Sequence, residues 1–224
     1  MNLGEAMTHV LRTKGQSIIQ SFWKEDLLSL ISDVITEGVK LFQDSKSRLR
    51  SLTIKELPGN IFASAREILE IARIMPERIR RALEVFREEM IHELEERPDA
   101  SEKALFSLKI LGVLFSSTAS AFYNMRNTGK ELSLGKLRVR SALAQFLVAE
   151  IVLRSFRLFL KRFLHELEKE LTEKADVDQV RYFRRLLDTG EVAENTAPAD
   201  DDPVFRIVDR IKNIVLTGDD EGQK

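Results

Sequence analysis

The sequence predicts an all-α fold, a multi-helix bundle built around a central apolar helix at about residues 104–125. Three observations carry this prediction. The 224 residues include only 10 glycines and 5 prolines, whereas an all-β protein of this size needs many more turn residues. Apolar residues recur at spacings of three and four, the period of an amphipathic helix. Hydrophobic residues make up 43% and charged residues 32%, which is typical of a globular protein.

Charge and cysteine content narrow the function classes. Lys and Arg total 35 against 36 Asp and Glu, and this balance argues against a general nucleic-acid binder, because such proteins carry a basic excess. The absence of cysteine excludes disulfides, thiol nucleophiles and cysteine metal sites. We expect no signal peptide in the first eleven residues, and therefore a cytoplasmic protein, with the periphery of a membrane as the other location considered.

The first helical region is predicted over residues 7–50, with one apolar stripe facing the core. The stripe consists of Phe22, Leu28, Ile31, Ile35, Val39 and Phe42. Gly15 offers a point at which this region divides into two helices. Residues 51–60 break the pattern and end in a Pro-Gly-Asn turn signal.

Two helices are predicted next, over residues 61–74 and 76–96, because Pro76 suits the first position of a new helix. The second has a clear apolar stripe of Ile79, Leu83, Phe86, Met90 and Leu94. Asp99 and Glu102 have the spacing of a capping box before the apolar helix at 104–125, in which Lys109 is the one charged residue.

The remainder is predicted as a basic connection, two helices, a linker and a last helix. The connection covers residues 126–140, and the helices cover 141–174 and 177–187. Residues 191–202 are rich in Ala, Asp and Pro and predict a disordered acidic linker. The domain organisation is therefore an N-terminal helical region (1–50), a helical core (51–190), the linker (191–202) and a C-terminal amphipathic helix with its tail (203–224).

Two segments share short words in the same order. His92-Glu93-Leu94-Glu95 matches His165-Glu166-Leu167-Glu168, with Lys-Glu-Leu before and Glu-Lys-Ala after each. A duplicated helical unit would explain the echo. Chance recurrence of Glu, Lys and Leu in amphipathic helices is the alternative, and we favour it.

The inventory of catalytic and metal-binding groups is thin. The His-Glu pairs at 92 and 165 lack the second histidine that a zincin motif needs four residues on. Glu89 and His92 have the Glu-x-x-His spacing of di-iron bundles, but Arg162 stands where the second copy needs a glutamate. No Ser-His-Asp order, phosphate-binding glycine loop or dinucleotide fingerprint is present. The sequence therefore predicts no catalytic residue, no metal ligand and no cofactor.

Glu150 lies within the apolar run 142–153 and has two interpretations. A buried carboxylate in such a run can anchor a ligand. The spacing also allows an i,i+4 ion pair with Arg154, which we favour.

Five basic residues crowd the connection at 126–140, offset only by Glu131. They are Arg126, Lys130, Lys136, Arg138 and Arg140. This set could bind an anionic surface such as lipid headgroups, or could be ordinary paired surface charge. The two apolar arms that it joins, within residues 104–153, are either buried core or a membrane-contacting hairpin. The second arm is shorter than the roughly 20 residues of a transmembrane helix, so we expect no permanent span.

The C-terminal helix at 203–216 carries an apolar stripe for partner binding. The stripe consists of Phe205, Val208, Ile211 and Val215. Such a helix can dock on its own core, on a second copy, or on a protein partner.

Three functions remain open from the sequence. The first is a non-enzymatic interaction or scaffolding protein, self-associating through its C-terminal helix. The second is a lipid- or membrane-surface-binding protein that uses residues 104–153 and the basic connection. The third is a helical enzyme dependent on a metal or small molecule, with Glu89, His92 and Glu150 as its candidates.

Overall fold

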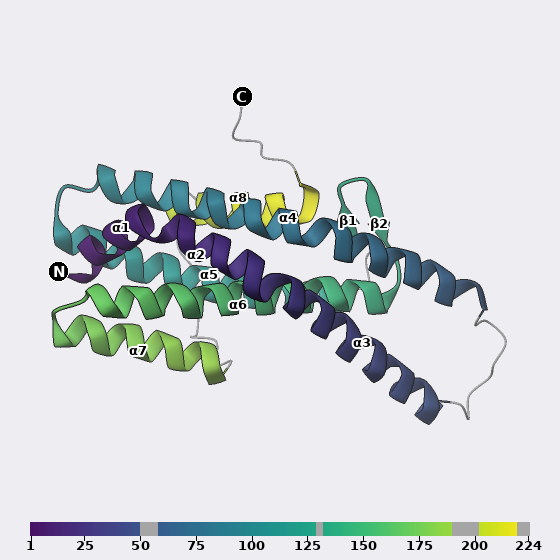
Figure 1. The fold of residues 1–224 in the computed structure, drawn as a ribbon. Helices are drawn as coiled ribbons and strands as arrows, with labels where there is room; N and C mark the ends of the chain where they lie inside the picture. The colour runs from purple at the N-terminus through teal and green to yellow at the C-terminus, as the bar shows by residue number, and fades with distance from the viewer. Residues whose placement is uncertain (50–57, 129–131, 190–201, 219–224) are drawn as a thin grey trace.

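The computed structural model describes residues 1–49, 58–128, 132–189 and 202–218, and nearly all of these are helical (Figure 1). The all-α prediction is confirmed. The helices are α1 (Leu3–Thr13), α2 (Gly15–Ser21), the π-helical segment η1 (Phe22–Leu27), α3 (Leu28–Leu49), α4 (Pro58–Glu96), α5 (Ala100–Thr128), α6 (Ala142–Glu170), α7 (Lys174–Thr189) and α8 (Pro203–Thr217).

The N-terminal region begins with a capping box. The Glu5 amide donates to the Asn2 side chain at 3.0 Å, and the Asn2 amide donates to the Glu5 carboxylate at 3.3 Å. The helix therefore begins at Leu3, before the predicted start at residue 7. Gly15 opens α2, which confirms the dividing point. From there the chain continues through η1 into α3 without a break.

The predicted pair of helices at 61–74 and 76–96 is wrong, because α4 runs through Pro76 as one helix. Proline lacks the amide that would bond to the Ala72 carbonyl, which normally favours a break. Here Ile71, Met75 and Ile79 are all fully buried, on one continuous face on both sides of the proline. The burial of that face offsets the lost hydrogen bond.

The connection predicted at 126–140 contains a small β-hairpin. α5 continues to Thr128, and strands β1 (Leu132–Leu134) and β2 (Leu137–Val139) pair antiparallel around a two-residue turn. Gly135 occupies that turn with φ 64°, a conformation that favours glycine. Leu134 and Val139 are buried, so the hairpin folds back onto the protein.

The helix predicted at 141–174 ends earlier, at Glu170. Ser141 caps its start by accepting a hydrogen bond from the Ala144 amide at 3.1 Å. Leu171 is extended and partitions the predicted helix into α6 and the start of α7.

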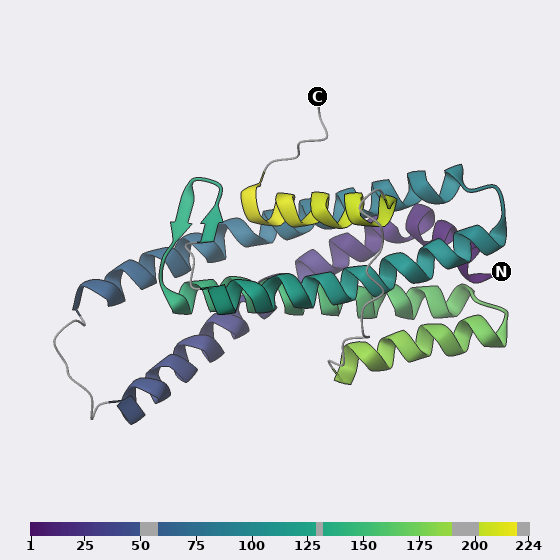
Figure 2. The same ribbon diagram turned by 180° about the vertical axis from the view of Figure 1, so that it is seen from behind.

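The core lies around the α5–α6 pair. α5 packs against α1, α6 and α8, while α6 packs against α1, α2, α3, α4, α5 and α7. Phe159 of α6 contacts three other rings, those of Phe22, Phe86 and Phe163, at centroid distances of 6.0–6.3 Å. The last turns of α3 diverge from this core (Figures 1 and 2).

Candidate functional site

The C-terminal helix α8 lies along α4 and α5 of its own chain (Figure 2). Val208, Ile211 and Val215 of the predicted stripe are buried, and Phe205 is half-buried. Three further aliphatic residues are also buried, namely Val204, Ile207 and Ile214. Full burial of an aliphatic side chain contributes roughly 1.5–3 kcal/mol, so the stripe dominates the docking. We call the covered part of α4 and α5, together with Arg78, Glu89, Glu93 and Lys109, the α8-docking surface.

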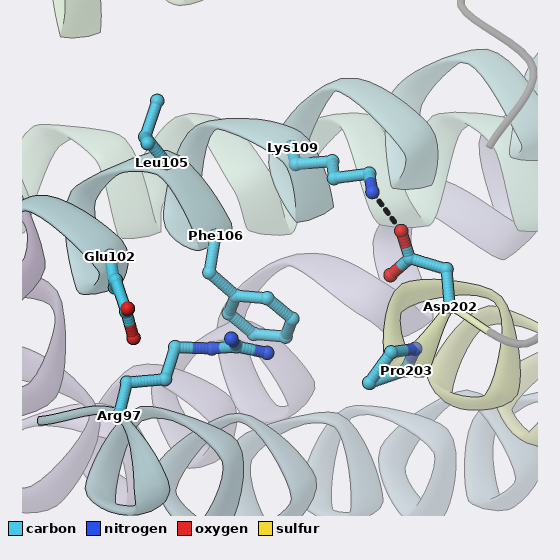
Figure 3. A pocket seen from close by; sticks show the side chains of 7 residues that line it. All are labelled: Arg97, Glu102, Leu105, Phe106, Lys109, Asp202 and Pro203. Atoms are coloured by element: carbon cyan, nitrogen blue, oxygen red, sulfur yellow. Dashed lines mark hydrogen bonds and ion pairs between the residues drawn. The ribbon is translucent and has the colours of Figure 1, made fainter. Parts of the chain in front are cut away.

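The start of α8 is fixed by Asp202. Its carboxylate accepts a hydrogen bond from the Val204 amide at 3.0 Å, and Pro203 takes the first helical position. The same carboxylate pairs with Lys109 of α5 (Figure 3). One acidic side chain therefore both caps α8 and ties it to its neighbour.

Two ion pairs set the register of α8 on α4. Arg206 pairs with Glu93 and Arg210 pairs with Glu89. The two arginines are one helical turn apart, as are the two glutamates, and the order of the pairs makes the helices antiparallel. Glu93 is only 5% exposed and also lies 3.5 Å from Arg97. A buried carboxylate without partners is costly, so the pairs select one register.

The end of α8 is recognised by Arg78 of α4. Its Nη1 donates to the carbonyl oxygens of Val215 at 3.1 Å and Leu216 at 2.6 Å, and its Nη2 donates to that of Thr217 at 3.2 Å. The last carbonyls of a helix lack partners within the helix and carry partial negative charge. A guanidinium meets both requirements at once.

The same guanidinium reaches the β-hairpin. Its Nη2 also donates to the carbonyl oxygen of Leu134 in β1 at 3.2 Å. Gly218 ends α8 with φ 80°, and its amide donates to the Ile214 carbonyl at 3.0 Å. Arg78 therefore joins α4, α8 and β1 at one point.

An open cavity of about 520 Å³ lies beside the start of α8 (Figure 3). It is lined by Arg97, Glu102, Leu105, Phe106, Lys109, Asp202 and Pro203. The Arg97 guanidinium lies 4.0 Å from the centre of the Phe106 ring, a cation–π contact. Two cations and two carboxylates line the cavity, so its charge favours neither anions nor cations.

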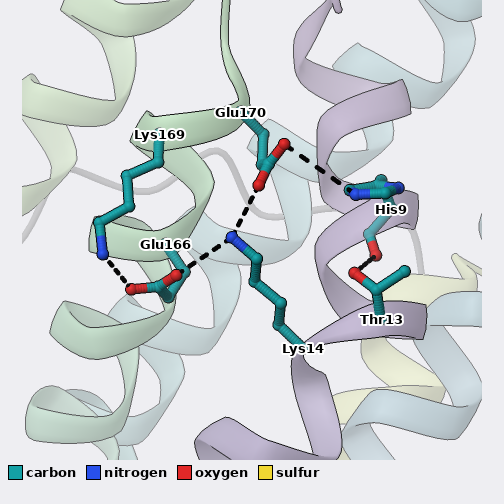
Figure 4. A network of polar contacts seen from close by, with 6 residues as sticks. All are labelled: His9, Thr13, Lys14, Glu166, Lys169 and Glu170. Carbon is teal, nitrogen blue, oxygen red and sulfur yellow. Dashed lines mark hydrogen bonds and ion pairs between the residues drawn. The ribbon is translucent and has the colours of Figure 1, made fainter.

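A second polar cluster joins the α1–α2 junction to the end of α6 (Figure 4). Lys14 Nζ donates to Glu170 at 2.7 Å and to Glu166 at 3.2 Å. The hydrogen bond to Glu170 raises the pKa of Lys14, against the opposing effect of burial. Hydrogen bonds lower the carboxylate pKa values, from Lys14 at Glu170 and chiefly from Lys169 at Glu166. His9 lies 4.0 Å from Glu170 at the margin of the cluster.

A recess of about 500 Å³ adjoins this cluster between α2 and α6. It is lined by Lys14, Ser17, Ile18, Ser21, Arg162, His165 and Glu166. Arg162 pairs there with Glu25 at 3.1 Å and Asp26 at 2.6 Å. Because each of its two cations faces two carboxylates, the recess has no positive excess for an anion, and the cluster acts as a clamp between helices.

The structure places three of the five predicted basic residues on or beside the hairpin. Lys136, Arg138 and Arg140 are all exposed. Within the described residues, Lys136 and Arg138 have no ion-pair partner, whereas the Arg140 amide donates to Glu67 at 3.1 Å. The side chains of Arg126 and Lys130 lie outside the described part of the chain.

Glu150 is engaged by Arg154, the pairing that its spacing allows. Arg154 Nε donates to Glu150 at 3.0 Å, and its Nη1 donates to Glu37 of α3 at 2.8 Å. Burial lowers the pKa of Arg154, but the two hydrogen bonds outweigh it and raise the pKa above its ordinary value. Arg154 thus ties α6 to α3 through Glu37, and Glu150 is its second partner, on the same helix.

The two residues with di-iron spacing have other partners. Glu89 pairs with Arg210, and His92 Nε2 lies 3.1 Å from Glu96. Among the residues that the structure describes, no group of three or more histidine and acidic side chains is arranged to hold a metal ion.

Sequence reasoning missed Arg78 and Lys14. The Arg78 partners are backbone carbonyls 56 to 139 residues away, and a carbonyl has no sequence signature. The Lys14 partners Glu166 and Glu170 are 152 and 156 residues away. The i,i+4 spacing of those two glutamates was the one available signal, because it places both on one helix face.

No helix in the described part of the chain combines the length and the apolar character needed to cross a membrane. Comparisons with protein-family models, with curated proteins and with solved structures found no match for this chain.

Proposed function

We propose that this chain is a non-enzymatic helical interaction protein that self-associates by exchanging α8 between two copies. The observation that carries the proposal is the matched register of Arg206 and Arg210 on Glu93 and Glu89. These pairs, the buried stripe and the two end contacts form a complete recognition surface for one helix. A second copy offers the same surface to the same helix.

Exchange requires the segment between α7 and α8 to reach a second copy. Twelve residues, 190–201, separate α7 from Asp202, and such a segment spans at most roughly 40 Å. Exchange of an identical element is a low-cost route to a dimer, because every contact is reused. Docking within one chain benefits from an effective concentration of order mM, so we expect the dimer at high protein concentration.

A charge-exchange experiment tests this proposal directly. One full-length variant carries Arg206→Glu with Arg210→Glu, and the other carries Glu89→Arg with Glu93→Arg. Each variant alone places like charges across the seam between α8 and α4, where positions 206 and 210 face positions 93 and 89. In an exchanged heterodimer both seams are complementary again, so mixing the two should form a species of about twice the 25.7 kDa chain mass. Native mass spectrometry with unequal isotope labels identifies it.

The matched control is Lys212→Glu, which reverses an exposed charge on α8 away from the seam. When Lys212→Glu is mixed with the variant that carries Glu89→Arg and Glu93→Arg, no heterodimer should form, because Arg206 and Arg210 would still face arginines in one of the two seams. The two seam variants are mixed, treated with mild denaturant to loosen α8, and returned to native conditions. If no heterodimer of the two chains then forms, exchange of α8 is refuted.

A second candidate function is binding to an anionic lipid surface through the hairpin. The observation that favours it is the exposure of Lys136 and Arg138 without described ion pairs. Many described apolar residues of the 104–153 arms are buried, including Ile110 and Leu147, so this candidate depends on the basic residues. It predicts co-sedimentation with anionic vesicles that weakens with salt and in Lys136→Glu with Arg138→Glu. If that variant sediments with the vesicles as well as the original chain does, lipid binding through the hairpin is refuted.

A further inference from the structure

The turn of the β-hairpin lies directly against the last turn of α8. A Cβ atom at Gly135 would lie 2.7 Å from the Thr217 carbonyl oxygen and 3.1 Å from Arg78 Nη2. At Gly218 a Cβ atom would lie 3.1 Å from the same nitrogen. Two glycines are therefore required where the hairpin, the helix end and the guanidinium meet.

The hairpin has little stability of its own. Its strands are three residues each, and an isolated two-stranded hairpin is marginal in water. Its buried side chains are Leu134 and Val139, at 1% and 0% exposure. β1 packs against α8 and β2 packs against α4, so the support of the hairpin comes from these two helices.

One nitrogen links the hairpin to the docked helix. Arg78 Nη2 donates to Leu134 in β1 and to Thr217 in α8, both at 3.2 Å. The Val215 and Leu216 carbonyls hold the other end of the same planar group. Without α8 the guanidinium loses these three helix carbonyls, and Leu134 loses the cover of the helix.

We propose that Arg78 makes the order of the β-hairpin depend on whether a helix occupies the α8-docking surface. An occupied surface holds the hairpin in place and fixes the presentation of Lys136 and Arg138. An empty surface releases the hairpin. This inference rests on the docked helix of the proposed function but not on exchange, because the α8 of either copy supplies the same carbonyls.

The test is hydrogen exchange of full-length protein at the amides of residues 132–139, compared with those of α8 and α6. In the Arg206→Glu with Arg210→Glu variant, we expect hairpin amides to exchange about tenfold faster or more, in step with α8. In Arg78→Gln, the buried stripe keeps α8 docked, and we expect hairpin exchange to rise more than α8 exchange. Arg78→Lys, which keeps the charge without the planar fork, should lie between Arg78→Gln and the original.

Arg185→Gln is the control, since Arg185 of α7 is an exposed arginine without a described ion pair. It should leave the hairpin unchanged. Loss of α8 protection with unchanged hairpin protection, or an unaltered hairpin in Arg78→Gln, would overturn the inference. If the double variant also loses α6 protection, Arg78→Gln decides the matter alone. If the protein is strictly monomeric and the hairpin loses protection together with α8, exchange is refuted and this inference is supported. If exchanged dimers form and the hairpin keeps its protection when α8 loses it, exchange is supported and this inference is refuted.

Discussion

Glu93 of α4 and Arg206 of α8, 113 residues apart in the chain, form an ion pair that is unequal in exposure. The glutamate side chain is 6% exposed and the arginine side chain is 65% exposed. Water can therefore solvate the arginine without its partner but cannot solvate the glutamate. The two ends of the pair should respond differently to substitution.

Removal of the arginine is expected to cost more than removal of the whole pair. Arg206→Ala leaves Glu93 buried with Arg97 as its remaining described partner, and should lower the free energy of unfolding by about 1–3 kcal/mol. Adding Glu93→Gln to that variant should recover part of the loss, because the unpaired charge is gone. Urea unfolding of the two variants measures the difference. A double variant less stable than Arg206→Ala would show that the carboxylate is not the source of the cost.

Two glycines inside helices should respond oppositely to alanine. A Cβ atom at Gly4 would lie 2.3 Å from Lys103 Cβ and 2.7 Å from the Ala104 nitrogen, where α1 crosses α5. At Gly112 it would meet no described atom within 4 Å. Gly4→Ala should therefore lower the free energy of unfolding by about 1–3 kcal/mol, because the added methyl group overpacks the contact. Gly112→Ala should raise the free energy of unfolding by about 0.5–1 kcal/mol, because alanine has the higher helix propensity. Thermal unfolding of the two variants measures both changes. Equal effects would contradict the close approach of α1 and α5.

The Lys14 cluster should make stability depend on pH in the acid range. The folded-state pKa values of Glu166 and Glu170 lie below their ordinary value of 4.5, so the unfolded chain binds more protons there. The contribution of these carboxylates is complete above 4.5 and is lost as pH falls through the lowered values. Since the pKa of Lys14 is raised above 10.5, its own contribution is complete below 10.5 and is lost at higher pH.

Lys14→Met should reduce the loss of stability on acidification, because Glu170 no longer has its lysine partner. Urea midpoints at several pH values between neutrality and acid measure this dependence. Lys24→Met, which removes an exposed lysine of η1, is the matched control. Parallel pH curves for Lys14→Met and the original chain would show that the cluster does not shift these pKa values.

Pro76 distinguishes one long helix from two. In the continuous α4, Pro76→Ala restores an amide that can bond to the Ala72 carbonyl. We expect a gain of about 1 kcal/mol in the free energy of unfolding, after the greater entropy of the unfolded chain is included. If Pro76 instead started a separate helix, alanine would bring no such gain. Thermal unfolding followed by circular dichroism measures the free energy of unfolding and the helix content of the two proteins.

Local patterns in the sequence predict local structure well in this chain. Gly15 and the cap at Asp99 are both found in the predicted places, because their effects depend on residues within one turn. Pro76 was misread because the buried face on either side of it, which is a property of the tertiary packing, outweighs its local preference.

The hairpin and the contacts of α8 needed information that no short window contains. Leu132–Val139 is too short to show a strand period, and its place depends on α4 and α8. The stripe of α8 was visible in the sequence, but it left its own core, a second copy and a protein partner open as the surface that it covers. The surface that it covers also depends on distant partners such as Glu89, Glu93 and Arg78, which the pattern of α8 does not contain. The two His-Glu-Leu-Glu words remain open to both interpretations, chance recurrence and a duplicated helical unit.

The π-helical segment η1 accommodates one extra residue between α2 and α3. Buried residues along this stretch fall at 18, 19, 22, 27, 31, 34 and 38, and the one step of five, from 22 to 27, spans η1. The wider turn absorbs one surplus residue and keeps both halves in phase on the same neighbours. Deletion of the exposed Lys24 would turn that step into four and leave an uninterrupted α-helix whose inward face needs no rotation. An added residue at the same point would turn every later contact of α3 by about 100° away from α6.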